Sequence, residues 1–231
     1  MSVATPRLAL FDLDGTLLDG DTDELWCDFL IDEGVLDRDD FEARNRSVVE
    51  RYRAGTIGAA EFCAFYASTL AGRPRADWLP LRSRFVATRV LPGIGDAARA
   101  LVARHREAGD RVLLTTATNR FLTEPIAADL GIADCDLIAT ELEEADGRFT
   151  GANSGVLNMR EGKLERLATW LAIRNLPASA VAEATFYSDS ANDLPLLRAV
   201  RRAVVVDPDP RLREEATQRG WQELRLARVA S

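Results

Sequence analysis

The chain has 231 residues, of which 47% are hydrophobic, and a formal net charge of -8. It is long and apolar enough for one large domain, or a core with an insertion, that folds without disulfides. The acidic balance argues against nucleic-acid or anionic-membrane partners, no apolar run could span a bilayer, and residues 1–7 do not resemble a signal peptide. Because the three cysteines match no disulfide or zinc pattern, the sequence favours a cytoplasmic protein that acts on a small molecule.

The first predicted element is a buried strand, Leu8–Asp12, that breaks into a turn at Gly15. Asp12 and Asp14 lie two residues apart at its carboxyl end, which is where open α/β sheets bind ligands. A carboxylate there can attack phosphorus and form an aspartyl phosphate if a cation offsets the repulsion, and a second carboxylate can move protons. Taken alone, the four residues 12–15 would equally suit an ordinary turn.

A long interval, residues 18–87, contains no convincing strand and shows several helical patterns. Apolar and aromatic residues recur at helical spacing before Gly34, Gly55 and Gly72, each of which is expected to end a helix. Thr56 is predicted to cap the third of these helices. We interpret the aromatic stripes as core rather than as ligand contacts.

Three local features follow the interval. His105 lies in a segment that resembles a surface helix, and we predict a solvated side chain because its neighbours are charged. The pattern at residues 119–130 predicts a helix that becomes regular only near Thr123, because Pro125 lies within it. Asp146-Gly147 predicts the turn of a β-hairpin, which we interpret as a small flap.

The remaining β-like runs alternate with helices, which predicts parallel strands joined by crossover helices. Several runs end in Asp or Thr, so polar side chains should gather at one edge of the sheet. We therefore predict an α/β fold, a Rossmann-like doubly wound sheet formed by residues 1–17 and 88–231, with an inserted α-helical cap at residues 18–87. These further strands are expected at residues 111–116, 136–140, 184–189 and 203–207.

Together with three later segments, the first motif resembles the haloacid dehalogenase superfamily of phosphatases, over nearly the whole chain. Asp12, Asp14 and Thr16 match the family's Asp-x-Asp-x-Thr motif, which implies a nucleophile, an acid/base and a supporting turn residue that helps to bind phosphate. Thr116, at the end of an apolar strand, matches the second motif, which implies that its hydroxyl and the Ala117 backbone N–H hold phosphate oxygens.

The last two motifs of the resemblance supply charge. Lys163 matches the lysine that neutralises the nucleophile and the transferring phosphoryl group. In the fourth motif Asp189 is implied to bind Mg²⁺, Asp193 to orient metal-bound water or Lys163, and Asn192 to contact the phosphoryl end. The resemblance thus implies a magnesium site formed by Asp12, the Asp14 carbonyl, Asp189 and, from outside the direct ligands, Asp193.

The position of the helical interval resembles the phosphoserine phosphatase-like branch, whose cap closes over small substrates. Asp21 corresponds to a glutamate that binds the substrate ammonium in that branch, whereas Asp23 and Glu24 are expected to be a solvated helix start. Phosphoserine should also require a cap arginine. The candidate arginines are Arg44, Arg46, Arg51 and Arg53.

The expected activity is hydrolysis of a small phosphomonoester with an amine, such as phosphoserine, by a monomer or a homodimer. Histidinol phosphate is the alternative substrate, for which acids and aromatic residues such as Trp26 or Phe65 should line the site. Two other classes stay open: a phosphotransferase that passes the group to an alcohol, and a noncatalytic binding member of the fold.

Overall fold

The computed structural model describes residues 6–226. Its centre is a seven-stranded sheet in the order β4-β3-β2-β1-β5-β6-β7, in which all neighbours are parallel except β3 and β4. The predicted α/β fold is confirmed, although the short edge strand β7 was not predicted. The strands are β1 Leu8–Phe11, β2 Arg111–Asn119, β3 Leu137–Ala145, β4 Arg148–Ser154, β5 Thr185–Ser188, β6 Arg202–Val206 and β7 Gln222–Leu224.

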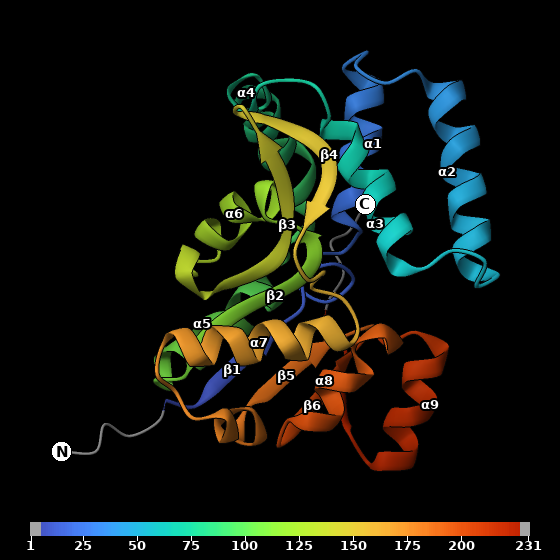
Figure 1. Ribbon diagram of the computed structural model, residues 1–231. Helices are drawn as coiled ribbons and strands as arrows, with labels where there is room; N and C mark the ends of the chain where they lie inside the picture. Colours follow the sequence, from blue (N-terminus) through green and yellow to red (C-terminus); the bar gives the residue numbers. More distant parts are fainter. Residues whose placement is uncertain (1–5, 227–231) are drawn as a thin grey trace.

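Helices cover both faces of the sheet (Figure 1). Successive side chains of a strand point to opposite faces, so Leu8 and Leu10 pack with α7, α8 and α9, whereas Ala9 and Phe11 pack with α5 and α6. Burial on both faces explains why β1 is an unbroken apolar run. The helices are α1 Thr22–Asp32, α2 Arg38–Arg53, α3 Ala59–Ala67, α4 Arg75–Phe85, α5 Asp96–Glu107, α6 Arg120–Asp129, α7 Glu161–Ile173, α8 Leu194–Ala199 and α9 Pro210–Arg219.

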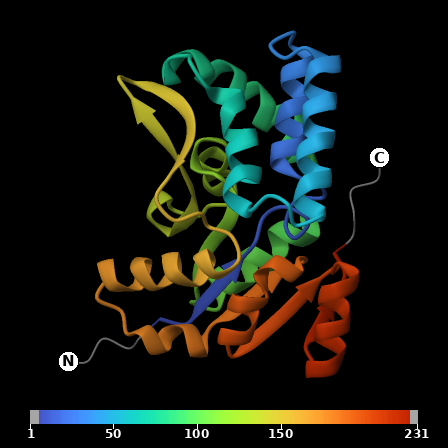
Figure 2. The ribbon, with the colours of Figure 1, turned by 45° about the vertical axis from the view of Figure 1, so that its right-hand side comes forward.

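The helical interval divides into two parts. Aromatic residues of α1 and α4, including Trp26 and Phe85, belong to the same buried cluster as β1 and β2. By contrast, α2 and α3 pack around a separate small cluster that contains Phe41 and Phe65. Figure 2 shows α2 and α3 side by side at the end of the molecule toward which β1 runs. The helix pair α2–α3 therefore has a small core of its own, and α3 also packs against β4.

The predicted cap of the third helix is wrong. Helix α3 begins after Gly58, not after Thr56. The Thr56 hydroxyl donates to the Arg51 carbonyl at 3.0 Å, so it satisfies a backbone acceptor at the end of α2. A threonine between two helices can serve either one, and the sequence did not distinguish them.

The predicted irregular start of the helix around Pro125 is also wrong. Helix α6 is regular from Arg120, and the Asn119 side chain caps it by accepting from the Leu122 N–H at 3.1 Å. Pro125 has no N–H to offer the Phe121 carbonyl one turn earlier. Arg82 of α4 donates to that carbonyl at 3.0 Å instead, so a distant side chain replaces the missing helical hydrogen bond.

His105 is not a solvated residue, which corrects another expectation. Its side chain is 14% exposed. Nδ1 lies 2.7 Å from Asp110 Oδ2, and Nε2 lies 2.7 Å from the Tyr187 hydroxyl oxygen on β5. The ring also packs edge-on against Phe11. Charged neighbours in the sequence misled the prediction, because a helix places them on a different face.

The predicted hairpin is confirmed: β3 and β4 pair antiparallel around Asp146 and Gly147. Both residues have positive φ, 49° and 72°, as a two-residue hairpin turn of the primed type requires. The hairpin contacts the start of α4, where the Arg75 N–H donates to the Gly147 carbonyl at 2.9 Å. No helix within residues 6–226 has the length and apolar character needed to cross a membrane.

Candidate active site

The first motif is held by a turn that only glycine fits well. Asp12 directly follows β1 and is 7% exposed. Gly15 has φ +71°, and a Cβ there would lie 2.2 Å from Asp189 Oδ2. This close approach lets the Thr16 hydroxyl donate to Asp189 Oδ1 at 2.9 Å. Thr16 does not line the cavity described below; the contact that its hydroxyl makes in the structure is with Asp189.

Lys163 joins the first and fourth motifs. Its Nζ lies 2.8 Å from Asp12 Oδ1 and 2.7 Å from Asp193 Oδ2, and its side chain is only 3% exposed. Asp193 also accepts from the Ser188 hydroxyl at 2.8 Å. Burial alone would lower the pKa of Lys163, but the two carboxylates outweigh it and raise the pKa overall, so the lysine is a permanent ammonium.

Negative charge exceeds positive charge around this ammonium. Burial raises the pKa of Asp12 well above its usual value, against the pull of Lys163 and with added repulsion from Asp193 and Asp189. Burial likewise raises the pKa of Asp189 to about 6, although the Thr16 hydroxyl opposes the shift. A bound cation would relieve this repulsion.

The oxygen atoms at this point fit magnesium. Asp12, Asp189 and the Asp14 backbone carbonyl are hard oxygen donors near one another in the fold, and both carboxylates line one cavity. Within residues 6–226 no group of three or more His, Cys, Asp or Glu side chains is arranged to hold a metal by itself. Mg²⁺ commonly binds through one or two carboxylates and keeps several waters.

Asp14 receives donors from two separate segments. Its Oδ1 accepts from the Thr22 N–H at 2.7 Å and from the Thr22 hydroxyl, at the start of α1. Its Oδ2 accepts from the hydroxyls of Thr118 at 2.8 Å and Thr116 at 3.3 Å. The Asp14 carboxylate therefore bridges α1 and β2.

The second motif differs from its expected arrangement. Thr116 is fully buried and does not line the cavity, whereas Ala117 and Thr118 do. Strand β2 continues to Asn119, past its predicted end at Thr116. Because residues two apart share a strand face, Thr118 follows Thr116 toward Asp14 and lies nearer the opening. The sequence missed Thr118, and the repeated Thr-x-Thr spacing was the signal that could have identified it.

Above these groups lies a cavity of 380 Å³ between the strand ends and helices α1, α2 and α3. Among the described residues that line it, Lys163 is the one cation, and no arginine is present. Asn192 and Asp193 lie in its wall as well. The acidic lining residues are Asp12, Asp14, Asp21, Asp23, Asp189 and Asp193, and the aromatic ones are Tyr52, Phe62 and Tyr66.

Two carboxylates on the α1 side distinguish the far part of the cavity. Asp21 is the N-cap of α1, accepting from the Glu24 N–H at 3.0 Å. Its side chain is open to solvent at the cavity mouth, yet the surrounding protein and the charge of Asp14 raise its pKa to about 7. Asp23, which we expected to be solvated, lines the cavity and is half-buried, and burial raises its pKa well above the usual value.

Five of the other specificity candidates do not line the cavity. Trp26 is 1% exposed and belongs to the core, and Phe65 packs inside the α2–α3 cluster. Arg44, Arg46 and Arg51 are exposed on α2 and do not line the cavity. The Arg53 side chain lies outside the described part of the structure.

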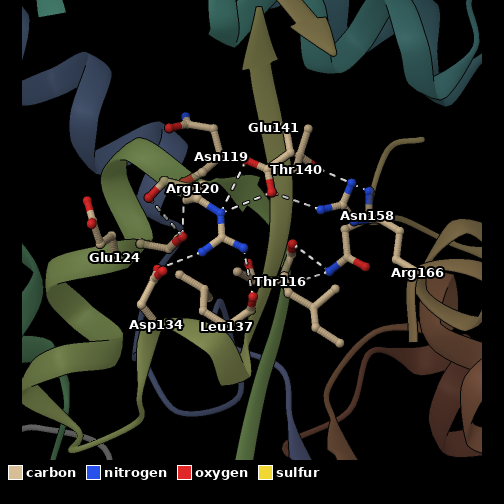
Figure 3. Close-up of polar contacts among 12 residues, drawn as sticks. Thr116, Asn119, Arg120, Glu124, Asp134, Leu137, Thr140, Glu141, Asn158 and Arg166 are labelled. Atoms are coloured by element: carbon tan, nitrogen blue, oxygen red, sulfur yellow. Dashed lines mark hydrogen bonds and ion pairs between the residues drawn. The ribbon is translucent and has the colours of Figure 1, made fainter. Parts of the chain in front are cut away.

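A polar network connects β3, α6 and α7 next to the site and is shown in Figure 3. Glu141 on β3 accepts from Arg120, at the start of α6, and from Arg166 on α7, both at 3.0 Å. Arg120 also donates to the Leu137 carbonyl at 2.8 Å. The network ties α7, which carries Lys163, to the helix that follows the second motif.

These features define a hydrolase class. The family model for haloacid dehalogenase-like hydrolases matches residues 9–198, and the chain belongs to this family. A histidinol-phosphatase of Neisseria meningitidis is 38% identical over 219 residues, which cover 94% of this chain and 98% of that protein. A phosphoserine phosphatase of Mycobacterium tuberculosis is 37% identical over 162 residues, 69% of this chain, but the match spans only 51% of that longer protein.

Solved structures confirm the architecture. A Bordetella pertussis protein described as having unknown function is 42% identical, with a TM-score of 0.90, 96% of this chain covered and 99% of that chain. A substrate-bound phosphoserine phosphatase complex has a TM-score of 0.66 at 19% identity, with 92% of this chain and 91% of that chain covered. The latter similarity shows the fold alone.

Proposed function

We propose that the protein is a magnesium-dependent phosphatase that hydrolyses histidinol phosphate through an aspartyl phosphate on Asp12. The observation that carries the substrate is the lining of the cavity, in which the described residues include carboxylates and aromatic rings but no arginine. Phosphoserine carries a carboxylate, which a wall containing Asp21 and Asp23 would repel. The identity to a histidinol-phosphatase over nearly the full length of both proteins supports the same substrate.

The chain's own residues divide the reaction among them. Lys163 holds Asp12 Oδ1, so the other oxygen of Asp12 is free to attack phosphorus. As the ester P–O bond breaks, Asp14 gives a proton to the leaving alcohol, and it later takes a proton from the water that cleaves the aspartyl phosphate. Thr118 and the Ala117 N–H, at the cavity wall, are placed to hold phosphate oxygens.

Magnesium, held by Asp12, Asp189 and the Asp14 carbonyl, would offset the charge of the phosphoryl oxygens. Asp193 acts on Lys163, which it contacts at 2.7 Å, rather than as a direct metal ligand. Asn192 lies in the wall beside these groups and contacts the phosphoryl end.

In the α1 half of the cavity, the substrate's basic groups meet Asp21 and Asp23. The ammonium group is expected to pair with Asp21. A flat imidazole fits beside Tyr52, Phe62 and Tyr66, whose rings can stack on it or contact its cationic form. A cavity of 380 Å³ has room for a substrate of this size.

The test is phosphate release from histidinol phosphate and phosphoserine, with and without Mg²⁺. We expect kcat/KM to favour histidinol phosphate by about a hundredfold, since rejection of a buried like charge costs several kcal/mol. Asp12→Asn should abolish turnover of both. Equal turnover, or a preference for phosphoserine, would reject the substrate, and full activity of Asp12→Asn would reject the mechanism.

The same assay addresses the two other classes. If added alcohols divert the phosphoryl group from water, the protein is a phosphotransferase. If folded protein releases no phosphate from any small phosphomonoester, the noncatalytic interpretation gains support. The arrangement of Asp12, Asp14 and Lys163 around one cavity favours catalysis over both.

A further inference from the structure

A contact between the helix pair α2–α3 and the core lies directly beside the cavity. Tyr52, on α2, and Asn192, in the fourth motif, both line the cavity. Arg160, in the turn before α7, connects them: its guanidinium donates to the Tyr52 hydroxyl at 2.6 Å and to Asn192 Oδ1 at 3.3 Å. It also lies over the Tyr52 ring, 5.3 Å from the centroid. We call Tyr52, Arg160 and Asn192 the cap clasp.

The backbone of Arg160 is held in an unfavourable conformation. Its φ is +54° and its ψ is -125°. The Gly162 N–H donates to the Met159 carbonyl at 3.0 Å, so Arg160 occupies the second position of a tight turn, and its own dihedral angles are those of that position in a type II′ turn. Glycine is the usual residue there, and a non-glycine residue costs about 1–3 kcal/mol. An arginine at a position that favours glycine points to a function for its side chain.

The turn that presents Arg160 is firmly fixed. Asn158 is fully buried, and its side-chain NH₂ group donates to Thr115 Oγ1, the Thr116 carbonyl and the Ile138 carbonyl at 2.8–3.0 Å. Its backbone N–H donates to the Thr140 hydroxyl at 3.1 Å. Figure 3 shows Asn158 directed at the strand that carries Thr116. The clasp is therefore built on the same rigid edge as the catalytic groups.

The other side of the clasp belongs to the helix pair α2–α3. Tyr52 stacks on Phe62 of α3 at 4.4 Å between ring centroids, within the α2–α3 pair. That pair packs around its own small cluster rather than in the main core. A contact to Tyr52 thus restrains α2 and α3 together, at the point where they cover the cavity.

We infer that Arg160 is a positioning residue that holds the α2–α3 pair closed over the cavity and orients the Asn192 side chain from outside the cavity. The inference rests on the proposed function only for its effect on turnover. Arg160 is exposed and lies outside the cavity lining, so it acts through Tyr52 and Asn192 and not on the substrate. Its loss should weaken closure for every substrate by the same factor.

Two matched variants separate the side chain from the backbone. Arg160→Ala removes the guanidinium and keeps the strain, whereas Arg160→Gly removes both. Both variants should lose about tenfold in kcat/KM, the effect of one charge-assisted hydrogen bond, on histidinol phosphate and on a minimal phosphomonoester alike. Arg160→Gly should nevertheless unfold at a higher denaturant concentration than Arg160→Ala.

Amide hydrogen exchange provides a readout that needs no substrate. Exchange across residues 38–67 should quicken by about tenfold in both Arg160 variants and in Tyr52→Phe, while exchange in β1 and β2 stays unchanged. Combining Tyr52→Phe with Arg160→Ala should add little, because both remove the same contact. Arg211→Ala, which removes a nearby exposed arginine on the core, is the control.

The outcomes distinguish the two proposals. Wild-type exchange rates at residues 38–67 in the Arg160 variants would overturn the clasp, whatever the activity. A loss confined to histidinol phosphate would also overturn it, because that pattern indicates direct substrate contact. Faster exchange in a protein that hydrolyses neither substrate would support the clasp and reject the proposed function.

Discussion

Because burial raises the pKa of Asp189, we predict that a single substitution there stabilises the metal-free protein while it removes a proposed metal ligand. Asp189 has a pKa of about 6 in the fold, against a usual value of 3.8. A raised carboxyl pKa means that the folded state disfavours the ionised form, so the cost is absent below about pH 4 and complete above about pH 6. A shift of about two units corresponds to about 3 kcal/mol.

Urea unfolding of wild type and Asp189→Asn in the presence of a chelator checks this value. The variant should match wild type near pH 4 and exceed its unfolding free energy by about 3 kcal/mol near pH 7. Asp134→Asn, at a side chain that is 70% exposed, is the control and should change little at either pH. Saturating Mg²⁺ should raise the stability of wild type and leave Asp189→Asn nearly unaffected.

A variant that is less stable than wild type near pH 7 would refute the reasoning. So would an advantage that does not change with pH, because it would have a cause other than the ionisation of Asp189.

Three further predictions concern single contacts. Asp21→Asn keeps a good helix cap but loses the charge of the carboxylate. In wild type, KM for the amine substrate should rise as pH falls through about 7, whereas in the variant KM should be high and independent of pH. A pH dependence of KM that persists in the variant would show that a group other than Asp21 causes it. Arg82→Met should lower the unfolding free energy by about 1–3 kcal/mol, because the Phe121 carbonyl loses its donor. In a Pro125→Ala background, where the backbone N–H of residue 125 can donate to that carbonyl, the same substitution should lower it clearly less. Equal losses in the two backgrounds would contradict this explanation. Asn158→Ala should lower the unfolding free energy by about 1–3 kcal/mol, measured by denaturation, and should lower kcat, measured by phosphate release. An unchanged kcat would show that the turn before α7 does not depend on Asn158.

Much of the fold followed from local patterns. The apolar run of β1 and the Asp146-Gly147 turn specify their structures through side-chain burial and backbone preference, which the chain carries within a few residues. Errors arose where a residue had two local options. Thr56 could serve either of two helices, and the charged neighbours of His105 concealed its contact with Tyr187, which is 82 residues away in the sequence.

The sequence by itself determined which chemical groups are present and in what order, because the spacing of Asp12 and Asp14 after a buried strand is a local property. Tertiary structure decided which side chains reach the cavity. It placed Thr118 rather than Thr116 at the opening, turned Asp23 inward, and replaced the expected Trp26 with other rings. It also set Arg160 between Tyr52 and Asn192. These choices depend on contacts between distant segments, and such contacts arise only when the strands are paired and the helices are packed against them.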